Sequence, residues 1–161
     1  MRDRSSITVP LLMSPPDHRF SLLRTWLFGP GADTAVHEAM SASGADVLIQ
    51  DLEDFTPPPR RDEAPALAAA LFARWHAAGA SVCARINSLH EDGPLDLSHV
   101  VPAKPDFIAY PKAATAHDMR ELDRAITAAE EQAGLVPGNI GILPVCETWY
   151  AQTTRRRFLR R

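Results

Sequence analysis

Residues 45–54 read ADVLIQDLED, and this stretch decides the fold that we predict for the chain. The run Ala45 to Gln50 is short and mostly apolar, which predicts a buried β-strand. Three carboxylates, Asp51, Glu53 and Asp54, follow directly at its end. Packing of a buried strand does not require charged residues at its end, so packing alone does not explain these carboxylates. The stretch therefore predicts both a strand and a polar site at its carboxyl end.

The same alternation of strand and helix extends to both sides of this stretch. The expected strands are 25–28, 45–50, 81–86, 106–109 and 140–145, and the expected helices are a segment capped by Asp33 and ended by Gly44, then 62–78, 95–101 and 115–133. Strands that alternate with helices in this way are typical of βαβ units and of a parallel sheet. Five such units fit either an open doubly wound sheet or part of a closed (β/α)8 barrel.

The turn after the first strand excludes dinucleotide binding. A dinucleotide-binding fold would carry Gly-x-Gly-x-x-Gly at this point, whereas residues 29–34 read GPGADT. The third glycine is missing, and Asp33 stands where a pyrophosphate would arrive. We therefore reject a nicotinamide or flavin dinucleotide as ligand.

The composition indicates a single globular domain of 161 residues, with 45% hydrophobic and 23% charged residues. No apolar run is long enough for a membrane span, and residues 1–16 lack a secretory signal pattern, so we expect a cytoplasmic protein without a membrane partner. Two cysteines, Cys83 and Cys146, lie in strand-like runs and are expected to be free thiols.

The charge of the chain is divided unevenly. Five arginines lie within residues 155–161, and without them 12 basic residues face 20 acidic ones. Such an acidic body argues against nucleic acid as the main partner. The six histidines show no spacing typical of metal ligands.

Charged residues collect where the predicted strands end, and the loops that bind ligands in a parallel α/β sheet converge at those ends. Glu147 can hold a hard divalent cation through oxygen or pair with a basic side chain. Arg85 offers a planar fork that fits a substrate carboxylate or, alternatively, the Asp51 cluster. Lys112 can bind an anion, act as a Schiff-base nucleophile, or form an ion pair.

The acidic stretch after the second strand has its own alternatives. Strand alternation places Asp51 and Glu53 on the same side of the chain. Two carboxylates that close raise each other's pKa unless a cation intervenes. The residues Asp51, Glu53 and Asp54 can therefore organise Arg85 or Lys112 rather than bind a ligand themselves.

Taken together, these motifs closely resemble one known family. RTWLFGPG at 24–31, GAD at 44–46, DLED at 51–54, RIN at 85–87, PK at 111–112 and ET at 147–148 resemble the citrate lyase beta-subunit-like branch of the HpcH/HpaI aldolase/citrate lyase family. The motifs follow in the family's order and spacing. The resemblance implies an α/β fold that is part of a TIM (β/α)8 barrel, with about five parallel strands and intervening helices.

The resemblance also implies a chemistry. Family members cleave or form C–C bonds beside a carboxylate or thioester, usually with Mg²⁺. Carried across, Arg85 binds the substrate carboxylate, Glu147 ligates Mg²⁺ and contacts substrate, and Arg24 reaches the substrate pocket. Asp54 stands where the aldolase branch has a histidine base, which favours an acyl-thioester lyase. The implied partners are a 2-keto acid and an acyl thioester of coenzyme A or an acyl carrier.

The resemblance divides the chain into three parts. Residues 1–23 are an N-terminal extension, 24–148 the N-terminal part of the barrel, and 149–161 a basic tail unlike the family. Family members continue further and supply a second Mg²⁺-binding aspartate. We therefore expect a truncated or frameshifted reading, rather than a native tail that binds RNA, membrane or a partner, and the first candidate function is a Mg²⁺-dependent lyase or its inactive remnant. The alternative function is a non-catalytic half-barrel that serves as a binding or assembly module.

A five-strand piece of a barrel has open edges at its first and fifth strands, and such edges invite association. We predict that this polypeptide alone is poorly stable or forms homo-oligomers through those edges. Light scattering after size exclusion, together with a thermal melt, measures both properties. A monomer that melts cooperatively would contradict the prediction.

Overall fold

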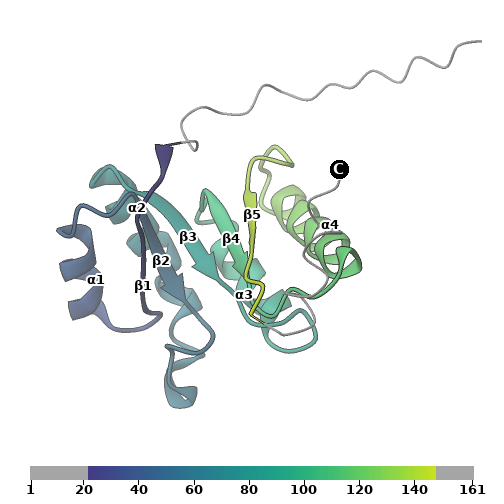
Figure 1. Cartoon of the computed structure of the whole chain (residues 1–161), viewed down its shortest axis with the longest axis horizontal. Helices are drawn as coiled ribbons and strands as arrows, with labels where there is room; N and C mark the ends of the chain where they lie inside the picture. The colour runs from purple at the N-terminus through teal and green to yellow at the C-terminus, as the bar shows by residue number, and fades with distance from the viewer. Residues whose placement is uncertain (1–21, 148–161) are drawn as a thin grey trace, which may run out of the picture.

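The computed structural model describes residues 22–147, and five parallel strands form its centre (Figure 1). The elements are β1 (Trp26–Pro30), α1 (Thr34–Ser41), β2 (Val47–Asp51), η2 (Pro58–Arg60), η3 (Pro65–Leu67), α2 (Ala68–Ala77), β3 (Ser81–Arg85), α3 (Gly93–Val100), β4 (Phe107–Tyr110), α4 (Ala116–Gln132) and β5 (Gly141–Pro144). The N-terminal extension, apart from its last two residues, and the arginine-rich tail lie outside the described residues.

The order of the strands distinguishes the two architectures that the sequence left open. The strands follow one another as β1-β2-β3-β4-β5, and each neighbouring pair is parallel. A doubly wound sheet reverses its strand order at a switch point, and this sheet does not. The prediction of an α/β fold with five parallel strands in barrel order is confirmed.

The two faces of the sheet are packed differently. On one face, strand residues such as Leu48 and Ile108 pack against α1, α2, α3 and α4 in a single large core. On the other face, the cluster of Val47, Ile49, Cys83 and Ala109 contains only residues from strands and the segments next to them. In a barrel, this second face is the interior.

A ring contact shows that the sheet curves. The centroids of Trp26 on β1 and Phe107 on β4 lie 5.3 Å apart. Two strands that are three places apart in a flat sheet would be separated by roughly 14 Å. The inner face is therefore concave, as in a barrel.

Local signals set most element boundaries. Asp33 caps α1 by accepting the N–H groups of Ala35 and Val36, each at 3.1 Å, as the sequence predicted. Thr115 and Asp118 form a capping box that begins α4. The expected helix 62–78 begins later, at Ala68, because Pro65 has no N–H and opens a short 3-10 turn instead. No helix within 22–147 is long and apolar enough to cross a membrane.

The glycine turn after β1 packs directly on the end of β2. The Gly31 N–H donates to Thr56 Oγ1 at 2.8 Å, and Gln50 Nε2 donates to the Gly31 carbonyl at 2.9 Å. A Cβ atom at Gly31 would lie 2.6 Å from Thr56 Oγ1 and 2.7 Å from the Asp51 carbonyl oxygen. Only glycine allows this close approach.

We therefore predict that Gly31→Ala lowers the free energy of unfolding by about 2–3 kcal/mol, since backbone atoms of β2 would have to move. Gly44→Ala is the matched control. Gly44 has a φ of +72° and nothing near its Cβ position, so its cost of about 1 kcal/mol comes from the backbone alone. Urea unfolding measures both variants, and an equal loss in the two would contradict the packing argument.

Candidate functional site

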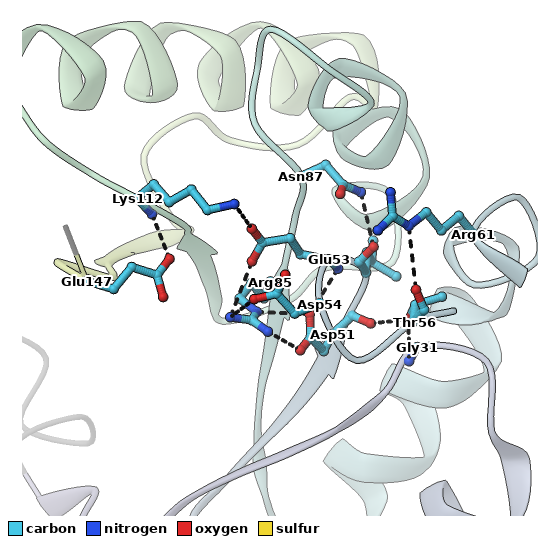
Figure 2. A network of polar contacts seen from close by, with 11 residues as sticks. Gly31, Asp51, Glu53, Asp54, Thr56, Arg61, Arg85, Asn87, Lys112 and Glu147 are labelled. Atoms are coloured by element: carbon cyan, nitrogen blue, oxygen red, sulfur yellow. Dashed lines mark hydrogen bonds and ion pairs between the residues drawn. The ribbon is translucent and has the colours of Figure 1, made fainter. Parts of the chain in front are cut away.

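The pairing of β2 with β3 brings the first two site residues together. Asp51 and Arg85 are the last residues of these strands and stand opposite each other in the register. Side chains at paired positions of adjacent strands project from the same face of the sheet. Both therefore lie on the concave face, at the carboxyl end of the sheet (Figure 2).

The Arg85 guanidinium is surrounded by acidic and aromatic side chains. Its Nε donates to Asp51 Oδ1 at 2.9 Å and its Nη2 to Asp51 Oδ2, while Nη1 lies 3.3 Å from Glu53 Oε2 and 3.8 Å from Asp54 Oδ2. The Phe28 ring stacks 5.2 Å from the guanidinium carbon. The side chains of Arg85 and Asp51 are only 8% and 0% exposed. The alternative that Arg85 pairs with the Asp51 cluster is thus what the structure contains.

Burial and charge act on Arg85 in opposite directions. Burial by itself would lower the pKa of the guanidinium, but the hydrogen bond to Asp51 and the charges of Asp51, Glu53 and Asp54 raise it further. Arg85 therefore stays cationic. Its Nη1 makes the longest contacts of the three nitrogens, so this atom is the one that an incoming carboxylate can engage most readily.

Lys112 continues the network from Glu53. Its Nζ donates to Glu53 Oε1 at 2.9 Å, and this hydrogen bond together with the Glu53 charge raises the pKa of the ammonium. A Schiff-base nucleophile needs a neutral amine at working pH, usually reached by a lowered pKa. The ion-paired alternative for Lys112 therefore holds, and the nucleophile alternative is disfavoured.

Glu147 is reached through the main chain of Lys112, whose N–H donates to Glu147 Oε1 at 3.1 Å. The contacts thus run without a break from Asp51 through Arg85, Glu53 and Lys112 to Glu147 (Figure 2). The guanidinium of Arg85 and the carboxylate of Glu147 lie on the same rim of the sheet. This placement is the one that the strand-end argument required.

Arg24 is placed elsewhere. The backbone N–H groups of Arg24 and Thr25 both donate to Asp46 Oδ2 at 2.8 Å, just before β1 and β2 begin. This is the amino-terminal edge of the sheet, opposite to the rim that holds Arg85. The backbone of Arg24 is thus held at this edge, and a role of its side chain in the substrate pocket stays a prediction.

Sequence reasoning missed two residues that support the rim. Thr56 Oγ1 donates to the Asp51 carbonyl and accepts from Gly31, which ties the loop after β2 to the turn after β1. Asp96 on α3 accepts the backbone N–H of Asn87 at 2.8 Å and its side-chain amide at 2.9 Å. Burial raises the pKa of the Asp96 carboxyl. Neither residue stands at a predicted strand end, so no local signal identified it.

A cavity of about 280 Å³ opens beside this rim. Its lining is largely polar and consists of Glu53, Ser88, His90, Glu91, Tyr110, Pro111, Lys112, Asp118 and Glu121. Because Glu53 and Lys112 line the cavity, a small ligand in it would lie within reach of the charged network.

Whether this site can bind a metal ion depends on which oxygen donors its residues supply. Among residues 22–147, no group of three His, Cys, Asp or Glu side chains is arranged to hold a metal ion. Mg²⁺ commonly takes only one or two protein carboxylates and completes its shell with water and substrate oxygens. Glu147 is exposed and supplies one hard oxygen ligand of this kind. The described residues therefore fit a Mg²⁺ held by a single protein ligand together with substrate.

The fold and the rim together define a class of protein. Parallel strands in barrel order that carry a charged cluster at their carboxyl ends are the arrangement of TIM-barrel enzymes. Comparison with protein families narrows this class. The family model for HpcH/HpaI aldolase/citrate lyase matches residues 24–153, and the chain belongs to that family.

Individual relatives place the chain in the citrate lyase beta-like branch. It is 31% identical over 128 residues to citrate lyase subunit beta of Haemophilus influenzae, which covers 79% of this chain and 44% of the relative. It is 37% identical over 119 residues to L-malyl-CoA/beta-methylmalyl-CoA lyase of Cereibacter sphaeroides, covering 69% of this chain and 36% of that enzyme. The chain thus spans less than half the length of these relatives.

Solved structures agree on the fold. RipC from Yersinia pestis superposes with a TM-score of 0.59 at 24% identity, covering 82% of this chain and 50% of RipC. The pyruvate/acetyl-CoA ternary complex of Haloferax volcanii malate synthase superposes with a TM-score of 0.69 at 19% identity, covering 84% of this chain and 43% of that one. At these identities the likeness shows the shared fold alone.

The buried pair of Arg85 and Asp51 yields a stability prediction. Arg85→Met leaves the Asp51 carboxylate buried without its partner, so we expect the free energy of unfolding to fall by about 3–5 kcal/mol. The double variant Arg85→Met/Asp51→Asn removes the unpaired charge and keeps the Oδ1 acceptor for the Glu53 N–H. We expect it to regain about 2 kcal/mol in urea unfolding. If the double variant were less stable than Arg85→Met, the buried-charge explanation would be wrong.

Proposed function

We propose that this protein is a C–C bond lyase that cleaves or forms the bond between an acyl thioester and a 2-keto acid with the help of Mg²⁺. One observation supports this proposal above the others. In a member of this family, a guanidinium that fits a carboxylate and a carboxylate that fits a divalent cation lie on the same rim, joined through Glu53 and Lys112.

The relatives support the thioester half of the proposal. One is named as a malyl-CoA and methylmalyl-CoA lyase and others as the beta subunit of citrate lyase. Asp54 stands where the resemblance places a histidine base in the aldolase branch. We therefore expect an acyl thioester, carried by coenzyme A or an acyl carrier, rather than a free hydroxy-dicarboxylate.

Arg85 would bind and orient the carboxylate of the substrate. Two of its nitrogens are held by Asp51, which fixes the plane of the guanidinium, and Nη1, 3.3 Å from Glu53 Oε2, is the nitrogen that a ligand would engage. A guanidinium that is already fixed in place loses little conformational freedom when it binds a carboxylate. Orientation of this kind contributes to catalysis because the bond to be broken is held in one geometry.

Glu147 would hold the Mg²⁺, which when bound polarises the keto oxygen as a Lewis acid. The Lys112 ammonium is bound to Glu53, and the hydrogen bond from Lys112 to Glu147 comes from its main-chain N–H. The Glu147 carboxylate is therefore not neutralised by a side-chain ion pair with Lys112.

The bond changes in the cleavage direction are those of a retro-aldol-type reaction. The hydroxyl of the substrate loses its proton, and its oxygen becomes the keto oxygen of the 2-keto acid. The electron pair of the broken C–C bond passes to the α-carbon of the thioester as an enolate, and protonation there gives the acyl thioester. Fixed positive charge near the developing oxyanion would supply most of the acceleration.

We further propose that the protein acts in the cytoplasm on small molecules and assembles as a homo-oligomer. Two observations support this proposal. Cys83 and Cys146 are free thiols, as expected in a reducing compartment. In the described sheet, β1 and β5 are the two edge strands, and edges favour association.

The activity is tested with malyl and citryl thioesters of coenzyme A as substrates, and release of the 2-keto acid is followed as its phenylhydrazone. We expect turnover with Mg²⁺ that is lost in EDTA. Glu147→Gln should lower kcat by about 10²-fold, as the loss of one preorganised electrostatic group does. Arg85→Lys should raise KM for the thioester. Arg60→Gln is the matched control and should behave as the unmodified protein, because Arg60 forms an exposed ion pair with Glu63 at 3.0 Å.

The outcomes separate the two candidate functions. Unchanged turnover in Glu147→Gln would remove that residue from the site. A folded chain without turnover on either thioester, with or without Mg²⁺, would favour the non-catalytic binding or assembly module. Circular dichroism on every variant establishes that a loss of turnover is not a loss of fold.

A further inference from the structure

The chain contains two lysines, Lys104 and Lys112, and both have a left-handed backbone. Their φ values are +59° and +51°, and no other non-glycine residue of the described part has a positive φ. This conformation is strained for a residue with a Cβ, so the surrounding structure must enforce it.

Lys104 has an ordinary explanation. It follows α3, and its N–H donates to the Val101 carbonyl at 2.9 Å, which is a hydrogen bond of a helix-ending turn. A left-handed residue shortly after a helix is common. Lys112 follows a strand instead, so this explanation does not apply to it.

A β-bulge enforces the conformation of Lys112. In a regular parallel ladder, one residue bonds to a carbonyl and an N–H that lie two residues apart on the neighbouring strand. Val145 instead donates to the Tyr110 carbonyl at 2.9 Å and accepts from the Ala113 N–H at 3.2 Å, three residues along. One extra residue is therefore inserted between these bonds. Bulges of this kind redirect side chains next to functional sites.

Because of the bulge, the main-chain N–H and the side-chain ammonium of Lys112 contact different carboxylates. Its N–H leaves the ladder and donates to Glu147 Oε1 at 3.1 Å, while its Nζ donates to Glu53 Oε1 at 2.9 Å (Figure 2). The other oxygen of Glu53, Oε2, lies 3.3 Å from Arg85 Nη1. Lys112 is the residue through which the proposed metal ligand and the proposed substrate-binding arginine are connected.

We propose that Lys112 is a positioning residue with two separable parts, an inference that rests on the proposed function. Its left-handed main chain holds the Glu147 carboxylate in place for the cation. Its ammonium holds Glu53, which keeps that carboxylate from occupying Arg85 Nη1 completely and so leaves this nitrogen for the substrate.

The main-chain part is tested by metal affinity in the presence of a 2-keto acid, with Mn²⁺ as a probe for the Mg²⁺ site and free Mn²⁺ measured by electron paramagnetic resonance. Glycine accepts a positive φ freely, whereas a β-branched residue resists it. We expect Lys112→Gly to keep the Mn²⁺ dissociation constant within about threefold and Lys112→Val to raise it about tenfold or more, as loss of an outer-shell contact does. Lys104→Gly is the matched control and should change nothing.

The side-chain part is tested with Lys112→Met, which keeps the backbone preference and most of the stem but removes the charge. We expect Mn²⁺ affinity to stay within about threefold, while KM for the acyl thioester rises about tenfold because Glu53 then competes for Arg85. The KM and the metal affinity should therefore separate in this variant. Loss of both together, or of neither, would overturn this part.

A second measurement keeps the main-chain part testable if Lys112→Val does not fold. ¹⁵N-lysine labelling gives two backbone amide signals, one from Lys104 and one from Lys112. We expect Glu147→Gln to shift the Lys112 signal and leave that of Lys104 in place. An unshifted Lys112 signal would overturn the proposed contact.

The two proposals fail in distinguishable ways. If Glu147→Gln leaves Mn²⁺ affinity unchanged, the metal role of Glu147 in the proposed function is wrong. If Glu147→Gln weakens Mn²⁺ binding but a folded Lys112→Val does not, only the role of Lys112 is wrong.

Discussion

The buried ion pair between Arg85 and Asp51 is the interaction on which the rest of the rim depends. A guanidinium and a carboxylate that are almost fully buried are stable only when each satisfies the other. Their pairing requires β2 and β3 to end at the same register position, which the parallel ladder provides. Glu53 forms an ion pair with Nη1 of the fixed Arg85, and Lys112 forms an ion pair with Glu53. The charged rim is therefore built outward from one pair.

Curvature of the sheet gives this pair its surroundings. Because the concave face brings β1 near β4, Phe28 stacks on the Arg85 guanidinium while Trp26 contacts Phe107. Aromatic rings shield the cation from water and leave its remaining nitrogen toward the rim. A flat sheet would expose the same guanidinium to solvent, where an ion pair contributes little. The same curvature therefore packs the inner face of the sheet and shields the ion pair at the rim from water.

Carboxylates outnumber cationic side chains in this network, and the excess of negative charge favours the binding of a cation. Among residues 22–147, Asp51, Glu53 and Asp54 form ion pairs with Arg85 or Lys112, and Glu147 accepts the Lys112 N–H. Both cations are bound by the acids of β2 and the loop that follows it, so the negative charge that remains lies mainly toward Glu147 and Asp54. An unneutralised carboxylate at the mouth of a barrel favours a cation, and a cation there favours an anionic oxyacid beside it.

The sequence by itself determined the strand and helix segments, the cap at Asp33, and the set of charged residues at the strand ends, because these signals lie within a few neighbouring residues. Only the tertiary structure decided the register that pairs Asp51 with Arg85, the place of the Arg24 backbone at the opposite edge, and the bulge that orients Lys112. Those features depend on partners far along the chain: 34 residues separate Asp51 from Arg85, 35 separate Lys112 from Glu147, and 59 separate Glu53 from Lys112. Register, curvature and a left-handed φ arise when such distant segments pack together, so no local pattern encodes them.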